Sequence, residues 1–306
     1  MIKSLSIVFL VFITLGCSFQ RIAVSMLADT LSGTTDSGNV FMRDNDPELI
    51  GDALPFTIKF YEMILDMQPN HRELLLTTGS LYVMYANAFV WAPAELYSYD
   101  KFEEQLTARR RAINFYLRGR DYILLALDEK YPGFAEAART RTHDPFLLRF
   151  DKTDVPYLYW LGAGWFGAFS LDVFNVELSI GAKVAADVIH RAYELDPDFD
   201  NRAIDEFYIS FHPVAPDIFG GDPGKTDYHF QRVVELRGES TIGPYLAYIE
   251  NVIIPKQDFS LFREFIQIIQ EIPINDYPDF LLINTIHKRK ADWMWKNRED
   301  LFLEFD

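Results

Sequence analysis

The stretch YLYWLGAGWFGAFSL, residues 157–171, mixes large aromatic rings with glycine and alanine, which is typical of a helix that packs closely against a neighbour. The run that follows it, 177–195, is apolar along one helical face and stops at Leu195-Asp196-Pro197. Because proline cannot continue a helix, the two runs predict a helical hairpin that ends near this proline. The sequence therefore favours an architecture of paired helices.

Similar pairs of helical patterns recur along most of the chain, whereas the alternation typical of strands is hard to find. We expect a crossover loop with short helical pieces at 135–152 and helices over the remaining ranges: 52–67 with 73–90, 101–130, 155–171 with 177–195, 204–211 with 225–236, 244–254 with 260–272, and 278–303. The prolines that end these pairs are unevenly spaced, so a regular repeat of about 34 residues does not emerge. The prediction is an all-α fold, an irregular tetratricopeptide-like solenoid in which neighbouring hairpins bury one another's apolar faces.

The composition agrees with a globular domain and excludes one class of partner. The chain has 306 residues, of which 49% are hydrophobic and 15% aromatic, enough to fill a substantial core. Its 45 acidic and 29 basic residues give a formal net charge of −16. Because such a chain repels phosphate backbones, we do not expect nucleic acid as a partner.

The N-terminus has the pattern of a secreted lipoprotein. Lys3 precedes an almost wholly apolar run at 5–15, and Gly16 stands before Cys17, the single cysteine of the chain. We interpret 1–16 as a signal peptide, too short to span the membrane, and Cys17 as the site of lipid attachment. An ordinary secretory signal with a chance cysteine is the alternative. Residues 17–39 then form the lipidated N-terminus and a tether, and 40–306 form a single α-helical domain without a disulfide.

Motifs for catalysis or cofactor binding do not emerge from the sequence. The six histidines show no dense metal-binding spacing, and neither H-E-x-x-H nor G-x-S-x-G occurs. GGDPGKT at 220–226 resembles a phosphate-binding loop, but Phe219 stands where the first glycine of that loop belongs. We read it as a turn followed by a helix start, with Asp222 as the N-cap and Pro223 in the first turn. We therefore expect no enzyme activity, catalytic residue, metal site or cofactor.

Two groups of side chains are candidates for binding, each beside a structural alternative. Trp160 or Trp165 could line an apolar cavity between helical pairs, although such aromatic clusters more often form core. Arg109, Arg110 and Arg111 are most simply a solvated face balanced by nearby glutamates. In so acidic a protein they are also a candidate docking patch.

Ten short motifs, spread in order over nearly all of the mature chain, resemble one known family, the T component associated with TRAP (tripartite ATP-independent periplasmic) transporters. These motifs are DNDPELI at 44–50, DALPF at 52–56, YLRGRDYILLAL at 116–127, PGF at 132–134, YWLGAGW at 159–165, RAYELDPDFD at 191–200, GGDP at 220–223, HF at 229–230, QD at 257–258 and LLINTIHKRKADWMW at 281–295. The segment ELRGESTIG and Ala203 depart from the family pattern, which affects local turns.

The resemblance implies a periplasm-facing lipoprotein, anchored by acyl groups to a cell membrane and built from cryptic tetratricopeptide-like hairpins. It also implies a homotrimer in which each protomer has a pore or cleft, and a partner, the periplasmic solute-binding P component. On this hypothesis the protein holds or passes a small solute, a hydrophobic one among the candidates, through a pore lined by Trp160, Trp165, Tyr208 and His212. A general cell-envelope interaction scaffold with no solute contact is the alternative.

Overall fold

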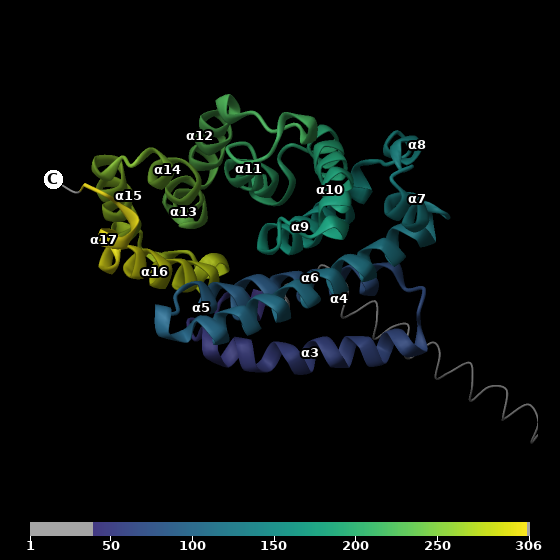
Figure 1. Ribbon diagram of the computed structural model, residues 1–306. Coiled ribbons are helices and arrows are strands. Elements are labelled where there is room, and N and C mark those ends of the chain that lie inside the picture. Colours follow the sequence, from purple (N-terminus) through teal and green to yellow (C-terminus); the bar gives the residue numbers. More distant parts are fainter. Residues whose placement is uncertain (1–38, 305–306) are drawn as a thin grey trace, which may run out of the picture.

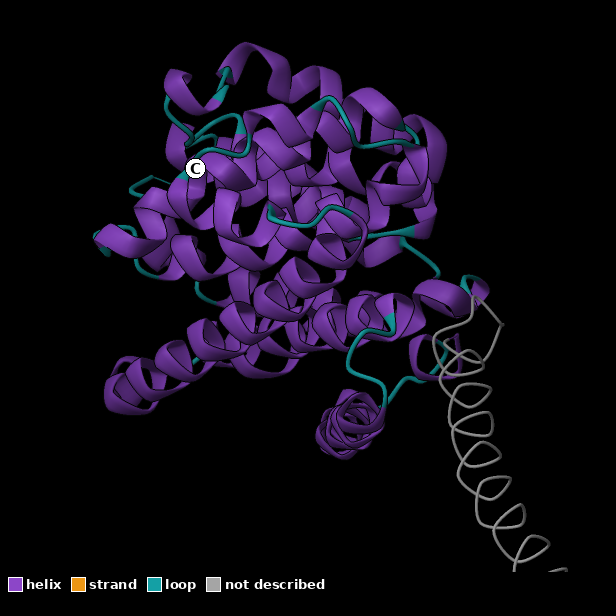
Figure 2. Ribbon diagram, turned by 90° about the vertical axis from the view of Figure 1, so that its right-hand side faces the viewer, coloured by secondary structure: helices purple, strands orange, loops and turns teal. Residues whose placement is uncertain are grey.

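The computed structural model describes residues 39–304, and within them every regular element is a helix (Figures 1 and 2). The main helices are α2 (Asn39–Met42), α3 (Pro47–Met67), α4 (Arg72–Tyr85), α5 (Ala92–Glu95), α6 (Phe102–Lys130), α7 (Phe134–Thr140), α8 (Asp144–Leu147), α9 (Val155–Leu171), α10 (Val176–Leu195), α11 (Phe199–Phe211), α12 (Thr226–Arg237), α13 (Gly243–Tyr248), α14 (Ile254–Lys256), α15 (Phe259–Glu271), α16 (Leu281–Lys296) and α17 (Arg298–Leu301). The all-α prediction is confirmed, while the signal peptide, Cys17 and most of the tether lie outside the described residues.

The first hairpin shows why the helix boundaries could be predicted. The Asp46 side chain accepts a hydrogen bond from the Leu49 amide at 3.0 Å, and Pro47 occupies the first turn of α3. Pro69 follows the end of α3, and α4 begins three residues later. α9 is the first helix of the predicted hairpin 155–171 with 177–195, and it has the predicted ends, 155 and 171.

Consecutive helices pack side by side in the order α3, α4, α6, α9 and α10, and the α11–α12 hairpin follows. α4 and α6 cross at two glycines. A Cβ atom built on Gly119 would lie 2.6 Å from the carbonyl oxygen of Gly79, so the two backbones touch directly there. Ile123 and Leu124 of α6 are fully buried beside this crossing.

The last long helix, α16, packs back on the start of the described chain, against α2 and α3 (Figure 1). Leu282 belongs to the apolar cluster of α3 and α4, whereas Met294 belongs to the cluster of α13 and α15. Between them the buried Asn284 accepts from the Ile242 amide at 3.0 Å and donates to the Ser240 carbonyl at 2.8 Å. α16 therefore connects the two ends of the fold.

Two predicted helices are irregular in the structure. The 73–90 helix becomes π-helical over Ala86–Trp91, and the expected helix at 278–303 is broken, with 3₁₀ residues before α16 and a separate α17 after Lys296. A second π-helical turn covers Ile249–Ile253. Each π-helical turn ends two residues before a proline, Pro93 or Pro255, whose ring and missing N–H disturb the preceding turn.

Within residues 39–304, one helical run, Arg72–Glu95, reaches the length and mean hydropathy of a membrane-spanning helix. Half of its most apolar window is buried inside the protein. This run contains α4, which packs between α3, α6 and α9. We therefore interpret it as a core helix.

A buried carboxylate joins α4, α6 and the start of α9. Asp154 is fully buried, and its oxygens lie 2.6 Å from Arg72 Nη2, 3.0 Å from Lys130 Nζ and 2.6 Å from the Tyr131 hydroxyl. Desolvation acts to raise the pKa of Asp154, but these hydrogen bonds and one from the Asp151 amide outweigh it and lower that pKa. The network is therefore stable only while Asp154 is ionised.

We expect Gly119→Ala to lower the free energy of unfolding by roughly 1–3 kcal/mol, because the new methyl group overlaps the Gly79 backbone. Urea unfolding followed by circular dichroism measures this cost. Gly224→Ala is the control, since a Cβ atom there meets only the Asp222 carboxylate at 3.2 Å. Equal stability of the two variants would contradict the close crossing.

Acid should destabilise the protein through Asp154. Because its pKa is lower in the folded than in the unfolded chain, its contribution is complete above the ordinary value of 3.8 and is lost as the pH falls below it. Asp154→Asn should lower the free energy of unfolding by roughly 2–4 kcal/mol at pH 7 and should make that free energy less dependent on acid pH. Unfolding curves between neutral pH and pH ~3 test both effects, and an unchanged acid dependence in the variant would refute the assignment.

Candidate functional site

A cavity of about 310 Å³ lies where α16 meets the N-terminal helices, and we name it the Lys290 cavity. A volume of this size suits a small ligand. Its wall combines charged and polar side chains with apolar ones. Its lining residues are Glu95, Leu96, Gln105, Glu250, Ile254, Lys290, Trp293, Met294 and Leu301.

The two π-helical turns position the acidic groups of this cavity. Glu95 ends α5, directly after the first π-helical turn, and Glu250 lies within the second. Lys290 Nζ reaches both, at 2.9 Å from Glu95 Oε2 and 2.5 Å from Glu250 Oε1. Trp91 holds the other Glu95 oxygen through its indole N–H at 2.6 Å. π-helical turns occur frequently at functional sites, which makes this pair of turns a reason to consider the cavity as a candidate site.

The charges of the cavity are unbalanced. Desolvation opposes the ammonium of Lys290, but Glu250 and Glu95 outweigh that effect and raise the pKa of Lys290. Desolvation also raises the pKa of Glu250, against the attraction of Lys290 and with the help of Glu95. One ammonium thus serves two carboxylates: Lys290 stays charged, and the raised pKa of Glu250 makes this carboxylate easier to protonate than an ordinary glutamate.

Further desolvated polar groups lie next to one another on α11, α13 and α16. A Cβ atom built on Gly243 would lie 2.2 Å from Glu206 Oε1 and 3.2 Å from His287 Cε1. His287 keeps some accessible surface, yet desolvation lowers its pKa to about 4, and its Nδ1 has no hydrogen-bond partner among the described residues. Arg237 pairs with Glu206. His287 is thus a desolvated imidazole that keeps some accessible surface beside the Glu206–Arg237 pair.

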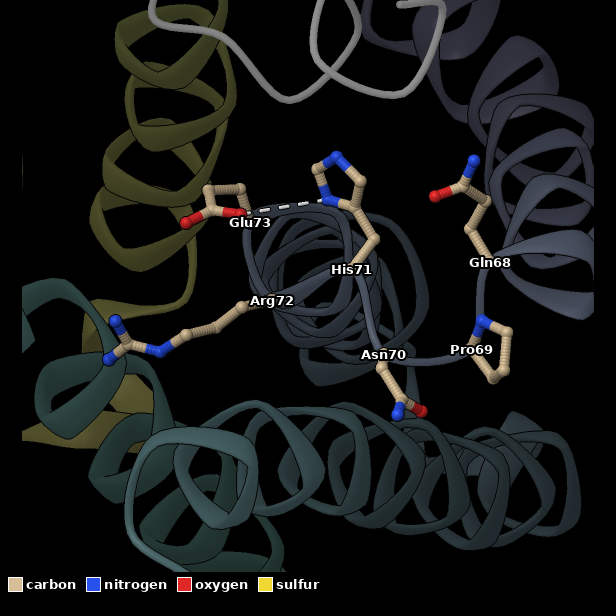
Figure 3. Close-up of a pocket in the computed structure, with 6 residues that line it drawn as sticks. All are labelled: Gln68, Pro69, Asn70, His71, Arg72 and Glu73. Carbon is tan, nitrogen blue, oxygen red and sulfur yellow. Dashed lines mark ion pairs between the residues drawn. The ribbon is translucent and has the colours of Figure 1, made fainter. Parts of the chain in front are cut away.

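A larger hollow of about 510 Å³ surrounds the turn between α3 and α4, and Figure 3 shows its lining. All six lining residues are consecutive, from Gln68 to Glu73, so one turn forms the hollow alone. Their polar atoms serve the fold: His71 Nδ1 accepts from the Leu74 amide at 3.2 Å, and Arg72 reaches Asp154. We therefore place the candidate site at the Lys290 cavity.

The structure separates the two tryptophans proposed for the pore. Trp165 is 5% exposed, and a Cβ atom on Gly181 would lie 1.6 Å from its Nε1, so the ring packs directly on α10. Trp160 is partly buried and contacts the apolar clusters on both sides of α9. Neither lines the Lys290 cavity.

Tyr208 and His212 belong to a buried cluster between α10, α11 and α12. The Tyr208 hydroxyl lies 2.6 Å from His190 Nδ1, and the His212 ring stacks between the rings of Tyr208 and His229 at 4.8 and 5.1 Å. Desolvation lowers the pKa of His212 to about 4. The cluster is compact and does not line the Lys290 cavity.

The GGDP turn packs on this cluster. His212 Nδ1 accepts from the Asp222 amide at 3.2 Å, and a Cβ atom on Gly220, whose φ is +86°, would lie 2.4 Å from His190 Nε2. The Asp222 side chain caps a 3₁₀ turn at Pro223, and α12 starts at Thr226. The predicted turn and helix start are confirmed, with a 3₁₀ turn before the α-helix. Gly220 is explained by its packing against His190.

The three arginines at 109–111 point in different directions. Arg109 Nε donates to the carbonyl of Leu171 at the end of α9, and Arg111 lies over the ring of Phe115 at 5.2 Å. Arg110 is exposed. None of the ion pairs found in the described residues joins them to Glu103 or Glu104.

One trio of metal-type side chains comes together that sequence spacing did not reveal. His143, Asp144 and Asp187 offer ligand atoms within 4.8 Å of one another. Asp187 is already bonded, to His143 Nε2 at 2.9 Å and to the Lys183 ammonium. The partners are 44 residues apart, so only the fold brings them together. We read the trio as a link between α8 and α10.

Lys290→Met should leave two carboxylates without their cation and lower the free energy of unfolding by roughly 1–3 kcal/mol at pH 7, a value reduced because both carboxylates are about a third exposed. The loss should shrink as the pH falls and Glu250 is protonated. Urea unfolding at pH 7 and at a lower pH measures the loss at each pH. Lys296→Met, exposed on the same helix, is the control and should be near neutral; an equal loss in it would contradict the pairing.

Comparison with known proteins assigns the chain to a family. The pattern of the family described as TRAP transporter T-component matches residues 43–302, nearly the whole described chain. A protein of Treponema pallidum (strain Nichols), described only as uncharacterized, is 32% identical over 304 residues, which cover 94% of each chain. The match includes every helix from α3 to α17 and all lining residues of the Lys290 cavity. The chain therefore belongs to the TRAP transporter T-component family.

Proposed function

We propose that this protein is a lipid-anchored, periplasm-facing accessory component of a TRAP solute-uptake system. It binds the periplasmic solute-binding P component and holds or passes a small solute beside it. Family membership supports the transport role, which is an accessory role and not an enzymatic one. The acyl anchor at Cys17 and the homotrimer rest on the sequence pattern and the resemblance.

The observation that carries the solute role is the Lys290 cavity. It lies between segments from both ends of the fold, and its wall joins an apolar part to one ammonium, two carboxylates and the Gln105 amide. Such a lining suits a small molecule with an apolar body and one polar end. Lys290, Trp293 and Met294 all belong to the 281–295 motif of the resemblance, which supports a shared role for this wall.

The succession of hairpins supports an irregular tetratricopeptide-like solenoid whose last long helix packs back on its first ones. In this proposal the cleft runs inward from the Lys290 cavity past His287 and Glu206 towards α9. Of the two tryptophans predicted to line the pore, Trp160 fits a cleft wall better, because it is only partly buried on α9. Arg110 is the arginine that best fits a docking contact, since it is exposed and has no hydrogen bond, ion pair or ring contact among the described residues, whereas the exposed Arg111 lies over Phe115.

The proposed partner is tested by a binding measurement. The mature chain 17–306 with Cys17→Ser, which lacks the signal peptide and cannot be acylated, should form a complex with its cognate P component at micromolar concentration in analytical ultracentrifugation. Absence of any complex would refute the partner assignment.

The solute role is tested with the fluorescent amphipathic probe 1-anilinonaphthalene-8-sulfonate. We expect saturable binding that Ile254→Trp, which fills the Lys290 cavity, weakens at least about tenfold, equivalent to ~1.4 kcal/mol. Leu148→Trp, at a side chain that is 85% exposed elsewhere, is the matched control. Unsaturable binding, or equal binding by the two variants, would favour a scaffold without solute contact.

A further inference from the structure

The lining of the Lys290 cavity contains hydrogen-bond acceptors that the protein does not use. Glu95 is fully paired, because its two oxygens lie 2.6 Å from the Trp91 indole nitrogen and 2.9 Å from Lys290 Nζ. Glu250 meets Lys290 through Oε1, and its Oε2 has no hydrogen-bond or ion-pair partner among residues 39–304. Gln105 donates its amide N–H to a backbone carbonyl at 2.9 Å, while its side-chain oxygen has no donor there either. The lining therefore has two unused acceptors, one of them charged.

The cavity also carries more negative than positive charge. Among the described residues that line it, only Glu95, Glu250 and Lys290 are charged, so one carboxylate has no cation of its own. The side chain of Glu250 is 35% exposed, and its desolvation is strong enough to raise its pKa. A carboxylate in such a wall is stabilised when a positive charge enters beside it. The formal net charge of −16 attracts cations from solution in the same way.

One side of the cavity presents an aromatic ring. Trp293 lines the cavity and is partly buried. Its ring takes part in none of the stacking or cation–π contacts found within residues 39–304, whereas the neighbouring Trp295 takes part in both kinds. The face of a tryptophan ring attracts a cation within about 6 Å of its centre. Ile254, Met294 and Leu301 complete an apolar surface around the ring.

Anionic and neutral ligands fit this lining less well than a cation does. An anion would add a third negative charge beside a single ammonium, in a wall that is already partly desolvated. A neutral ligand would leave the charge of Glu250 uncompensated, even where it donates a hydrogen bond to Oε2. An organic ammonium is a hydrogen-bond donor and a positive charge at once. The charge of Lys290 does not prevent its entry, because Glu95 offsets that charge at 2.9 Å.

We propose that the Lys290 cavity binds a small organic cation, a primary amine with an apolar body. Its ammonium donates to Glu250 Oε2, with the Gln105 side-chain oxygen as a second acceptor, and its body packs against Trp293. Glu95 and Lys290 form the ion pair that supports this arrangement. The inference rests on the solute role of the proposed function and adds the chemical class of the solute.

The test compares three probes that share one ring: 1-naphthylmethylamine, the uncharged 1-naphthylmethanol and the anionic 1-naphthylacetate. Isothermal titration calorimetry measures their binding to the mature chain 17–306 with Cys17→Ser. Salt at about 150 mM screens long-range attraction, and at pH 8 the amine is still mostly protonated. We expect the amine to bind at least about tenfold more tightly than the alcohol or the acid. Ile254→Trp, which fills the cavity, should weaken the binding of all three.

A variant of the carboxylate tests which group recognises the ammonium. Glu250→Gln keeps the size of the side chain and removes its charge, so the amine should lose at least about tenfold in affinity while the alcohol binds as it does to the parent. Glu264→Gln removes an exposed carboxylate on α15, outside the cavity lining, and is the matched control. It should leave all three affinities unchanged. Circular dichroism and urea unfolding check that each variant is folded.

The outcomes separate this inference from the solute role itself. 1-Anilinonaphthalene-8-sulfonate is an anion that reports on the apolar part of the wall. If Ile254→Trp weakens its saturable binding but the amine binds no better than the alcohol and the acid, the inference alone is overturned. A preference for the amine that Glu250→Gln leaves unchanged also overturns it. Absence of saturable binding by all four probes overturns the solute role and this inference together.

Discussion

The ion pairs of Lys290 tie together segments that are far apart in the chain, and much of the architecture depends on this junction. Lys290 and Glu95 are separated by 195 residues and Lys290 also reaches Glu250. Beside them α16 contributes apolar contacts to two different clusters. Together these contacts close the row of helices, and the Lys290 cavity takes its walls from both of the segments that they join.

Local signals in the sequence allowed most of the helices to be predicted, but they gave no indication of the Lys290 cavity. The limits of α9 and the capped start at Asp222 follow from helical periodicity, proline and capping residues, which act within a few positions. The π-helical turns were missed because their local sequence still reads as helix. Lys290 meets Glu95 only through tertiary packing, and nothing in the pattern around either residue signals the other.

The aromatic stretch at 157–171 shows how one segment can pack closely and still leave one ring only partly buried. Trp165 packs on Gly181 as a core residue would, and its glycine neighbours let α9 approach adjacent helices. Trp160 remains only partly buried between two apolar clusters. The mixture of aromatic residues and glycine at 157–171 thus builds close helix crossings in this TRAP transporter T component and leaves one aromatic ring beside the proposed cleft. The compact histidine cluster, in turn, supports the GGDP turn.

The central claim is that the fold is closed through Lys290 and that this closure maintains the cavity. A double-mutant cycle between Glu95→Gln and Lys290→Met, measured by urea unfolding with Cys17 replaced by serine, tests it most directly. The account predicts a coupling free energy of about 1–2 kcal/mol, because each single change removes the same contact. Strictly additive losses would contradict it, since they would mean that the two residues do not meet in solution.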